Sequence, residues 1–240
     1  LIDGGGFGDN SAFDVGRSVV APLLWRNKIK TIDRVILSHP NSDHLNGLLF
    51  ILNHFSVGEV WSNHETAEAM GYRLWQQAIG DHGIRHVDFE RLPRHSDQAG
   101  VVFDILGPPD DFLQRRGVER WRDENNNSLV VRVAWKEVAF LFSGDIMAAA
   151  EAELVARHGA QGLQSTVLFV PHHGSRGSSS MGFLQAVHPL ESIVSCGADN
   201  RFKFPHAATL DRLQAVGARM WRTDQCGAVR IVTDGTEYAV

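Results

Sequence analysis

Short apolar runs rich in valine and isoleucine alternate along this 240-residue chain with segments of helical period, and this alternation restricts the fold most. The predicted buried strands span residues 34–38, 58–61, 101–106, 129–134, 138–142, 166–170, 192–195 and 229–233. The predicted helices span residues 14–25 (with a kink at Pro22), 45–54, 65–78, 148–157 and 207–216. The pattern predicts an α/β chain whose sheets are covered by helices on their outer faces. Because only a short turn separates the strands at 129–134 and 138–142, they pair antiparallel and the sheets are mixed.

Two stretches depart from this alternation. Residues 108–127 begin with Pro108-Pro109 and carry pairs of Asp and Arg, so they are predicted to be a polar loop that hangs over a site. Residues 220–240 are predicted to form a β-hairpin or meander around Gly227 and Asp234-Gly235.

Composition excludes several classes of protein. No run of about 18 apolar residues exists, because Arg132, Lys136 and Glu137 interrupt the most apolar region, so these residues contain no membrane span. The net charge of −5 argues against general electrostatic attraction to nucleic acid or anionic lipid, and such binding would need a local basic patch. Two cysteines cannot form a disulfide framework. Twelve histidines beside two tyrosines direct the search toward metal sites.

The first residues, Leu1-Ile2-Asp3-Gly4, lack a methionine and a preceding turn, which is the pattern of a strand already in progress. We therefore expect a fragment or an excised domain. The lack of a signal peptide then says nothing about the parent protein.

The sharpest motif is the segment from Ser38 to His44, Ser-His-Pro-Asn-Ser-Asp-His, which follows a predicted buried strand and precedes an apolar helix. A loop at the end of a strand presents its side chains where the ligand sites of α/β folds gather. Three metal-binding side chains fall within six residues, namely His39, Asp43 and His44. Imidazole and carboxylate together suit Zn²⁺, Mn²⁺ or Fe²⁺. The alternative is that Ser42 or Asp43 caps the next helix and the histidines are bystanders.

Two further strand ends carry polar residues. Phe142 is followed by Ser-Gly and then by Asp145, a carboxylate that can bridge two cations. Val170 is followed by Pro and then by His172 and His173, of which one can be a ligand and the other a proton donor. The alternatives are a common Gly-Asp turn and a surface loop.

Taken in order, these motifs resemble those of the metallo-β-lactamase superfamily, and more narrowly the C-terminal hydrolase (nuclease) domain of the ComEC family of competence and DNA-uptake proteins. The His-Pro-x-x-Asp-His element of residues 39–44 marks the superfamily. Pro-His-His-Gly-Ser at 171–175 and the Asn-x-x-x-x-Pro-His element at 200–206 mark the narrower family. Asp3-Gly4-Gly5, Asn-Asn-Ser before a strand and Thr223-Asp224 also match in order, so the resemblance covers nearly the whole chain.

The resemblance implies a single αββα-sandwich domain over residues 1–240 with mixed sheets, truncated at its N-terminus because the first two strands lie upstream of Leu1. It also implies a dinuclear site at one edge of the sheets. The implied metal ligands are His39, Asn41, Asp43, His44, Asp145 and His172. The family usually has His or Asp where this chain has Asn41, and an amide oxygen is a weaker ligand. We therefore expect one firmly held divalent ion or two of unequal affinity, Mn²⁺ or Zn²⁺, with hard oxygen ligation favouring Mn²⁺ or Mg²⁺.

The implied reaction is hydrolysis of a phosphodiester by metal-activated water. The catalytic residues implied are Asp43, which orients the nucleophile, Asp145, which bridges the cations, and His173, which with His206 is a candidate proton donor. The predicted substrate-binding residues are Ser175, Arg176, Asn127 and His206. For these the alternatives are a flexible loop, a turn cap and a surface histidine at the start of a helix. Phe204 stands where some relatives carry His, which leaves His206 as the one imidazole of its loop.

One aromatic side chain is a candidate for stacking on a nucleic-acid base. Trp121 lies among Arg115, Arg116, Arg120 and Arg122, which form the one local basic patch of the sequence. The alternative is an ordinary solvated loop.

Three functions remain open at this point. The first is a metal-dependent phosphodiesterase or DNA nuclease linked to DNA uptake in natural transformation, with single-stranded DNA as substrate. The second is a small-molecule metallo-hydrolase of the phosphocholine-ester or lactone type. The third is a DNA-binding module whose catalysis is impaired by Asn41. If the parent is a ComEC-like protein, the resemblance places this domain beside a membrane channel portion, on the extracytoplasmic side of the inner membrane.

Overall fold

Most of the alternating apolar runs form strands of two large sheets in the computed structural model, which describes residues 1–8 and 12–240. The chain divides into two units, Leu1–Leu92 and Pro93–Val240, and each is described by itself. That residues 1–240 act as one domain stays a prediction.

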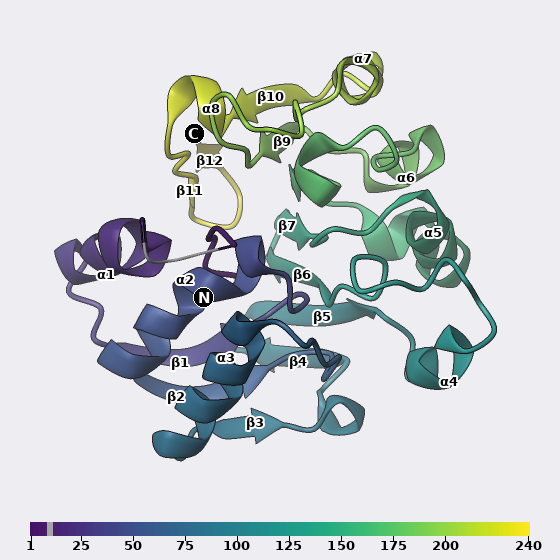
Figure 1. Cartoon of the computed structure of the whole chain (residues 1–240). Coiled ribbons are helices and arrows are strands. Elements are labelled where there is room, and N and C mark those ends of the chain that lie inside the picture. The colour runs from purple at the N-terminus through teal and green to yellow at the C-terminus, as the bar shows by residue number, and fades with distance from the viewer. Residues whose placement is uncertain (9–11) are drawn as a thin grey trace. The chain divides into compact units, whose positions relative to one another are not determined.

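The first unit is built on a parallel sheet of order β1-β2-β3 (Figure 1). Its strands are β1 (Thr31–Ile36), β2 (Ser56–Trp61) and β3 (Arg85–Val87). Its helices are the π-helix η1 (Gly16–Val20), α1 (Ala21–Arg26), α2 (Ser42–His54), α3 (Met70–Asp81) and the 3₁₀-helix η2 (Phe89–Arg91). Apolar side chains of α2 and α3 pack with those of β1 and β2 into one core, in which Leu45, Leu48 and Trp75 are fully buried. This packing fixes α2, and with it the motif at its start.

The second unit is built on a mixed sheet of order β10-β9-β8-β7-β6-β5-β4 (Figure 1). Its strands are β4 (His95–Gln98), β5 (Val101–Gly107), β6 (Val130–Trp135), β7 (Val138–Phe142), β8 (Val167–Phe169), β9 (Glu191–Val194) and β10 (Arg219–Arg222), and a separate hairpin pairs β11 (Val232–Thr233) with β12 (Tyr238–Ala239). Its helices are α4 (Phe112–Arg116), α5 (Ala148–Leu163), η3 (Pro171–Gly174), α6 (Met181–Val187), α7 (Ala207–Ala215) and α8 (Thr223–Cys226). The predicted antiparallel pairing of β6 with β7 is confirmed.

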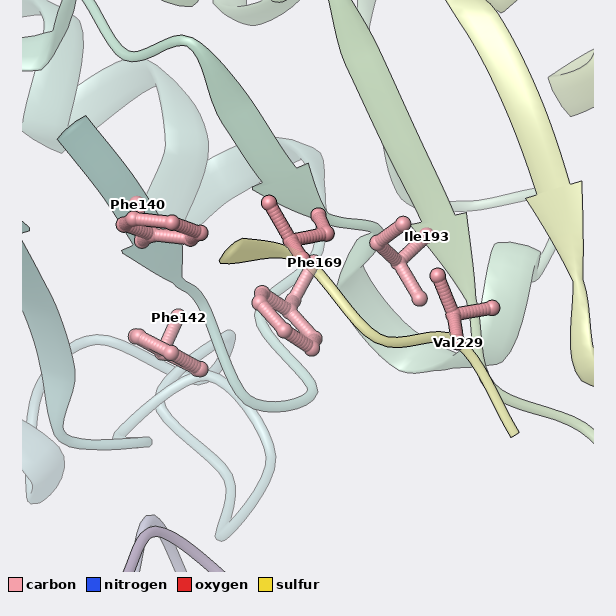
Figure 2. A pocket seen from close by; sticks show the side chains of 6 residues that line it. Phe140, Phe142, Phe169, Ile193 and Val229 are labelled. Carbon is pink, nitrogen blue, oxygen red and sulfur yellow. The ribbon is translucent and has the colours of Figure 1, made fainter. Parts of the chain in front are cut away.

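The central strands β7 and β8 of this sheet carry apolar side chains on both faces, as expected for strands that are nearly continuous hydrophobic runs. Leu141 and Leu168 point into the core formed with α5 and α6. On the other face lies a small pocket lined by Phe140, Phe142, Phe169, Ile193, Val229 and Ile231 (Figure 2). Its lining is entirely apolar, so this pocket offers neither a nucleophile nor a metal ligand.

Several predicted elements differ from the structure. The helix predicted over 65–78 begins only at Met70. The helix predicted over 14–25 is η1 followed directly by α1, and Pro22 is the second residue of α1. The polar loop predicted over 108–127 contains α4, which is held by buried Phe112.

The end of the chain also differs in part. No hairpin forms at Gly227, because the residues before it make the turn of α8, whereas the hairpin at Asp234-Gly235 is present. Within the described residues no helix is long and apolar enough to cross a membrane. Cys196 and Cys226 are free thiols.

Candidate metal centre

The first group of predicted ligands lies between β1 and α2. His39 is fully buried and His44 is 6% exposed, and their ring centroids are 4.2 Å apart. The N-cap of α2 is Asn41, whose carbonyl oxygen accepts the N–H groups of His44 and Leu45. The structure therefore does not support capping by Ser42 or Asp43 as the explanation of this motif; Asp43 lies in the first turn of the helix.

His44 is oriented by a carboxylate from the first residues of the chain. Its Nδ1 lies 2.7 Å from Oδ2 of Asp3, and Asp3 also accepts the backbone N–H and the hydroxyl of Ser38 at 2.8 Å each. The Ser38 hydroxyl is in turn 3.0 Å from Nδ1 of His39. A carboxylate at Nδ1 selects the Nδ1–H tautomer, so that the Nε2 lone pair is the one offered to a metal.

Glycines allow Asp3 to approach the helix. A Cβ on Gly47 would come within 2.0 Å of the carbonyl oxygen of Gly4, and a Cβ on Gly4 would lie 2.4 Å from the backbone nitrogen of Leu48. The backbones instead bond directly, Gly4 N–H to the His44 carbonyl at 2.8 Å and Gly47 N–H to the Gly5 carbonyl at 2.8 Å. The glycines of both segments thus bring Asp3 next to His44.

The second group begins at Asp145, just beyond the end of β7. Its side chain is nearly inaccessible, with 4% exposed, and its backbone N–H donates to the Ser128 hydroxyl at 3.0 Å. Two residues on, the N–H of Met147 donates to Oδ1 of Asn126 at 2.9 Å. The Asn-Asn-Ser segment therefore holds the turn that carries Asp145.

Both neighbouring histidines face that carboxylate. Nε2 of His172 lies 3.9 Å from one oxygen of Asp145, and Nε2 of His173 lies 3.7 Å from the other. Both residues have left-handed backbones, with φ of +50° and +53°. Two consecutive non-glycine residues in this region are costly and persist only where the surroundings impose them. Nδ1 of His173 is 2.8 Å from the Ser195 carbonyl oxygen, which again makes Nε2 the ring nitrogen able to ligate a metal.

A buried carboxylate holds the loop that follows these histidines. Glu151 on α5 is fully buried and accepts the backbone N–H groups of Ser179 and Ser180, the latter at 2.7 Å. From the opposite direction the Arg212 guanidinium on α7 donates to the carbonyls of Ser179 and Ser178 at 2.8 Å each. Burial raises the pKa of Glu151, and the hydrogen bonds from Ser180 and Ser179 oppose that rise.

The predicted substrate-binding residues have different surroundings. Ser175 is 5% exposed and Asn127 is fully buried, whereas Arg176 is exposed. His206 is the N-cap of α7, and its Nδ1 accepts the Ala208 N–H at 3.1 Å. The role of all four in substrate binding stays a prediction.

Two arginines of the patch around Trp121 are held in ion pairs, whereas Arg116 and Arg120 are exposed. The side chain of Arg122 is fully buried, and its guanidinium is 2.6 Å from Glu119 and 2.5 Å from Glu153. Arg115 is paired with the same two carboxylates. Trp121 packs against the core, and the Arg122 guanidinium lies over its ring. Arg115 and Arg122 thus belong to an ion-pair network, which the solvated-loop alternative does not describe, while base stacking by Trp121 stays a prediction.

Three residues that position the site were assigned no role from the sequence: Asp3, Glu151 and Ser195. Asp3 belongs to the Asp3-Gly4-Gly5 motif that matches the family, and this match was a signal that could have assigned Asp3 to the site. Glu151 and Ser195 carry no local signal, because their partners are distant in sequence.

Each unit, taken by itself, carries imidazole and carboxylate donors, and this chemistry fits divalent cations of the Zn²⁺, Mn²⁺ or Fe²⁺ type. In the first unit the donors are His39, Asp43 and His44. In the second they are Asp145 with His172 and His173. The carboxylate on His44 and the carbonyl on His173 are the partners usually found behind metal-bound histidines.

Comparison with known proteins agrees with the family resemblance found in the sequence. The family model described as the metallo-beta-lactamase superfamily matches residues 1–197. The chain is 28% identical over 222 residues to ComE operon protein 3 of Bacillus subtilis (strain 168), covering 91% of this chain and 27% of that protein. It is 31% identical over 222 residues to competence protein ComA of Neisseria gonorrhoeae, covering 92% of this chain and 28% of that protein.

Among solved structures, a metallo hydrolase named Igni18, from Ignicoccus hospitalis KIN4/I, aligns with 86% of this chain and 78% of that chain, at 14% identity and a TM-score of 0.48. The chain spans about a quarter of the length of the curated relatives. Since the family model covers more than three quarters of the sequence, including every candidate ligand, the chain belongs to the metallo-β-lactamase superfamily.

Proposed function

We propose that this chain is a metal-dependent phosphodiesterase that cleaves DNA, with one or two divalent ions held by His39, Asn41, Asp43 and His44 of the first unit and by Asp145 and a histidine of the second. The nucleic-acid substrate is supported by the similarity to a competence protein and a ComE operon protein. The single observation that carries the metal chemistry is the orientation of His44 by Asp3 and of His173 by Ser195.

In this proposal His173 is the ligand of the second unit rather than its proton donor. The Ser195 carbonyl fixes the Nδ1–H tautomer of His173, and this leaves no proton on Nε2 to give away. His172, whose Nε2 also faces Asp145, is the alternative ligand. The bound cations supply an activated water and charge neutralisation at phosphorus.

His206 is the better hydrogen-bond donor to the substrate on the same reasoning. Because its Nδ1 accepts the Ala208 N–H, the neutral ring carries its hydrogen on Nε2 and can donate a hydrogen bond from there to a phosphate oxygen. Asp43 orients the attacking group, while Arg176 and Ser175 bind the phosphate. Asn127, which is fully buried, acts by holding the turn next to it.

The test is a cleavage assay on end-labelled single-stranded and double-stranded DNA with Mn²⁺ or Zn²⁺. We expect cleavage by the wild type and a loss of about 10³-fold or more in Asp145→Asn, since removal of a charged metal ligand removes the cation that drives the reaction. Asp97→Asn, an exposed carboxylate in the same unit, is the matched control and keeps full activity.

Asn41 provides a second arm of the experiment. Asp at an N-cap is as good as Asn, so Asn41→Asp preserves α2 while adding a charged ligand. We expect tighter metal binding and faster cleavage in this variant. DNA binding without cleavage in both proteins would instead indicate a DNA-binding module. Hydrolysis of a phosphocholine ester or a lactone, with DNA left intact, would indicate the small-molecule enzyme. A location at the extracytoplasmic side of a membrane is proposed on the same similarity.

A further inference from the structure

An aromatic ladder leads from solvent to one of the candidate site histidines, all within the second unit. We use this name for Phe202, Phe204 and His172. The rings of Phe202 and Phe204 are stacked, with centroids 5.5 Å apart and planes 18° apart. Phe204 meets His172 edge-on at 5.7 Å. Phe202, the outermost ring, is 57% exposed.

The turn that carries these rings is held by its own hydrogen bonds. Asn200 donates from its side-chain amide to the carbonyls of Phe204 at 2.7 Å and Gly197 at 3.0 Å, and its Oδ1 accepts the Phe204 N–H at 2.9 Å. Beyond the turn, the His206 N–H donates to the Gly174 carbonyl at 2.9 Å. Phe202 is therefore exposed on a fixed turn, and little conformational entropy is lost when a ligand stacks on it.

The charges around the ladder suit a polyanion with flat rings. The Arg201 guanidinium lies 4.6 Å from the centroid of the Phe202 ring, and Lys203 is exposed in the same turn. Asp199 is the one acidic side chain of this short turn. A base that stacks on Phe202 in place of the Arg201 guanidinium breaks only one weak, exposed cation–π contact of the protein. The guanidinium is then free to bind a phosphate of the same strand.

A single exposed phenylalanine is ordinary and needs no explanation. Here the exposed ring lies on a hydrogen-bonded turn, has a cation over it, and is connected through Phe204 to a histidine beside Asp145. We propose that the aromatic ladder is a stacking platform for an unpaired base of single-stranded nucleic acid, which positions the neighbouring phosphodiester for hydrolysis. This inference rests on the proposed function for its biological meaning. Because the bases of a duplex are already stacked, the platform favours single strands.

The experiment measures binding in the presence of EDTA, so that it does not depend on hydrolysis. The probes are fluorescein-labelled oligodeoxythymidylate, an abasic sugar-phosphate strand of the same length, and a duplex, each followed by anisotropy. We expect Phe202→Ala to bind oligodeoxythymidylate about tenfold more weakly, as for the loss of one base–aromatic stack, and to bind the abasic strand as the wild type does. Phe202→Leu keeps apolar bulk without a π face and loses most of the affinity, whereas Phe202→Trp retains it. Phe13→Ala, another exposed phenylalanine at 47% exposure, is the matched control and changes neither affinity.

Four results would overturn the inference. The first is that the wild type binds the abasic strand as tightly as oligodeoxythymidylate, and the second is that it binds the duplex as tightly as oligodeoxythymidylate or more tightly. The third is that Phe202→Ala loses the same affinity for the abasic strand as for oligodeoxythymidylate. The fourth is that the wild type binds none of the three probes. The proposed function fails separately. If no strand is cleaved with Mn²⁺ or Zn²⁺ although stacking is lost in Phe202→Ala, the platform stands and the hydrolase assignment does not.

Discussion

Replacement of Glu151 by Gln tests whether the loop after His172 and His173 is held by a buried carboxylate. In the wild type the two oxygens of Glu151 accept the N–H groups of Ser179 and Ser180. A Gln side chain keeps one acceptor and turns an NH₂ group toward the other N–H, which is left buried without an acceptor. Such an orphaned donor costs about 1–3 kcal/mol.

An opposing effect reduces this loss. Burial raises the pKa of Glu151, which means that the charged form is less favourable in the folded chain than in the unfolded chain, and Gln removes that charge. We therefore expect a net loss near the middle of the range, about 2 kcal/mol in the free energy of unfolding. For a chain of this size that corresponds to a fall in Tm of about 4–8 °C. Glu137→Gln, an exposed glutamate in the same unit, is the matched control and leaves Tm within about 1 °C.

The pH dependence gives an independent readout of the same group. A carboxyl whose folded pKa is raised stabilises the fold fully below its unfolded pKa, and this contribution is lost as pH rises through the folded pKa. The stability gap between wild type and Glu151→Gln should thus narrow as pH rises from about 4 toward neutrality, when both are followed by urea denaturation. An unchanged Tm together with parallel pH profiles would refute the carboxylate clamp. Metal affinity, measured by titration, should fall with stability because the clamp holds the histidine loop.

Three further outcomes are expected. Asp3→Asn should weaken metal binding by about 10–100-fold, measured by calorimetric titration, because His44 loses its orienting carboxylate, and unchanged affinity would contradict that role. Burial, and then the neighbouring His64, lower the pKa of His86 to about 4, so wild-type stability should decline as pH falls from about 6.5 toward 4. His86→Gln should show a smaller decline in the same denaturation series, and an identical decline would exclude His86 as its source. Arg122→Leu should lose about 1–3 kcal/mol in urea unfolding because Glu119 and Glu153 lose the buried one of their two cations and keep only the half-buried Arg115, whereas unchanged stability would show that the network is dispensable.

The predictable part of the fold is the part with a buried, periodic face. The strands from β5 to β9 and the long helices α2, α5 and α7 bury apolar side chains at regular spacing, and the sequence predicts each of them. Strand β4, with the sequence His-Ser-Asp-Gln, escapes prediction because it is the edge of the sheet and has no apolar face. Helix α6 escapes because seven residues are too few to establish a period.

The same distinction applies to the candidate site. The donors His39, Asp145 and His173 lie within four residues of a strand end, and Asp43 lies in the first turn of the helix that follows β1, so local pattern identifies them. The groups behind them come from far along the chain: Asp3 is 41 residues from His44. Local pattern carries no information about such pairs, and the resemblance to a family supplied the only hint of Asp3.

The loop over residues 175–180 shows more clearly how far a local sequence pattern can predict a binding partner. Its serine hydroxyls, its backbone amides and the Arg176 guanidinium suit an anion, and in the structure a carboxylate does occupy two of these amides. That anion is the chain's own Glu151, because α5 packs beside the loop and delivers a carboxylate to the amides of Ser179 and Ser180. Backbone chemistry therefore predicts the kind of ligand but not its source. Since these two amides are already engaged, a substrate phosphate would have to rely on exposed cations of the second unit, such as Arg176 or the Arg201 of the aromatic ladder. Removal of either guanidinium should then lower the salt dependence of DNA binding by about one phosphate contact.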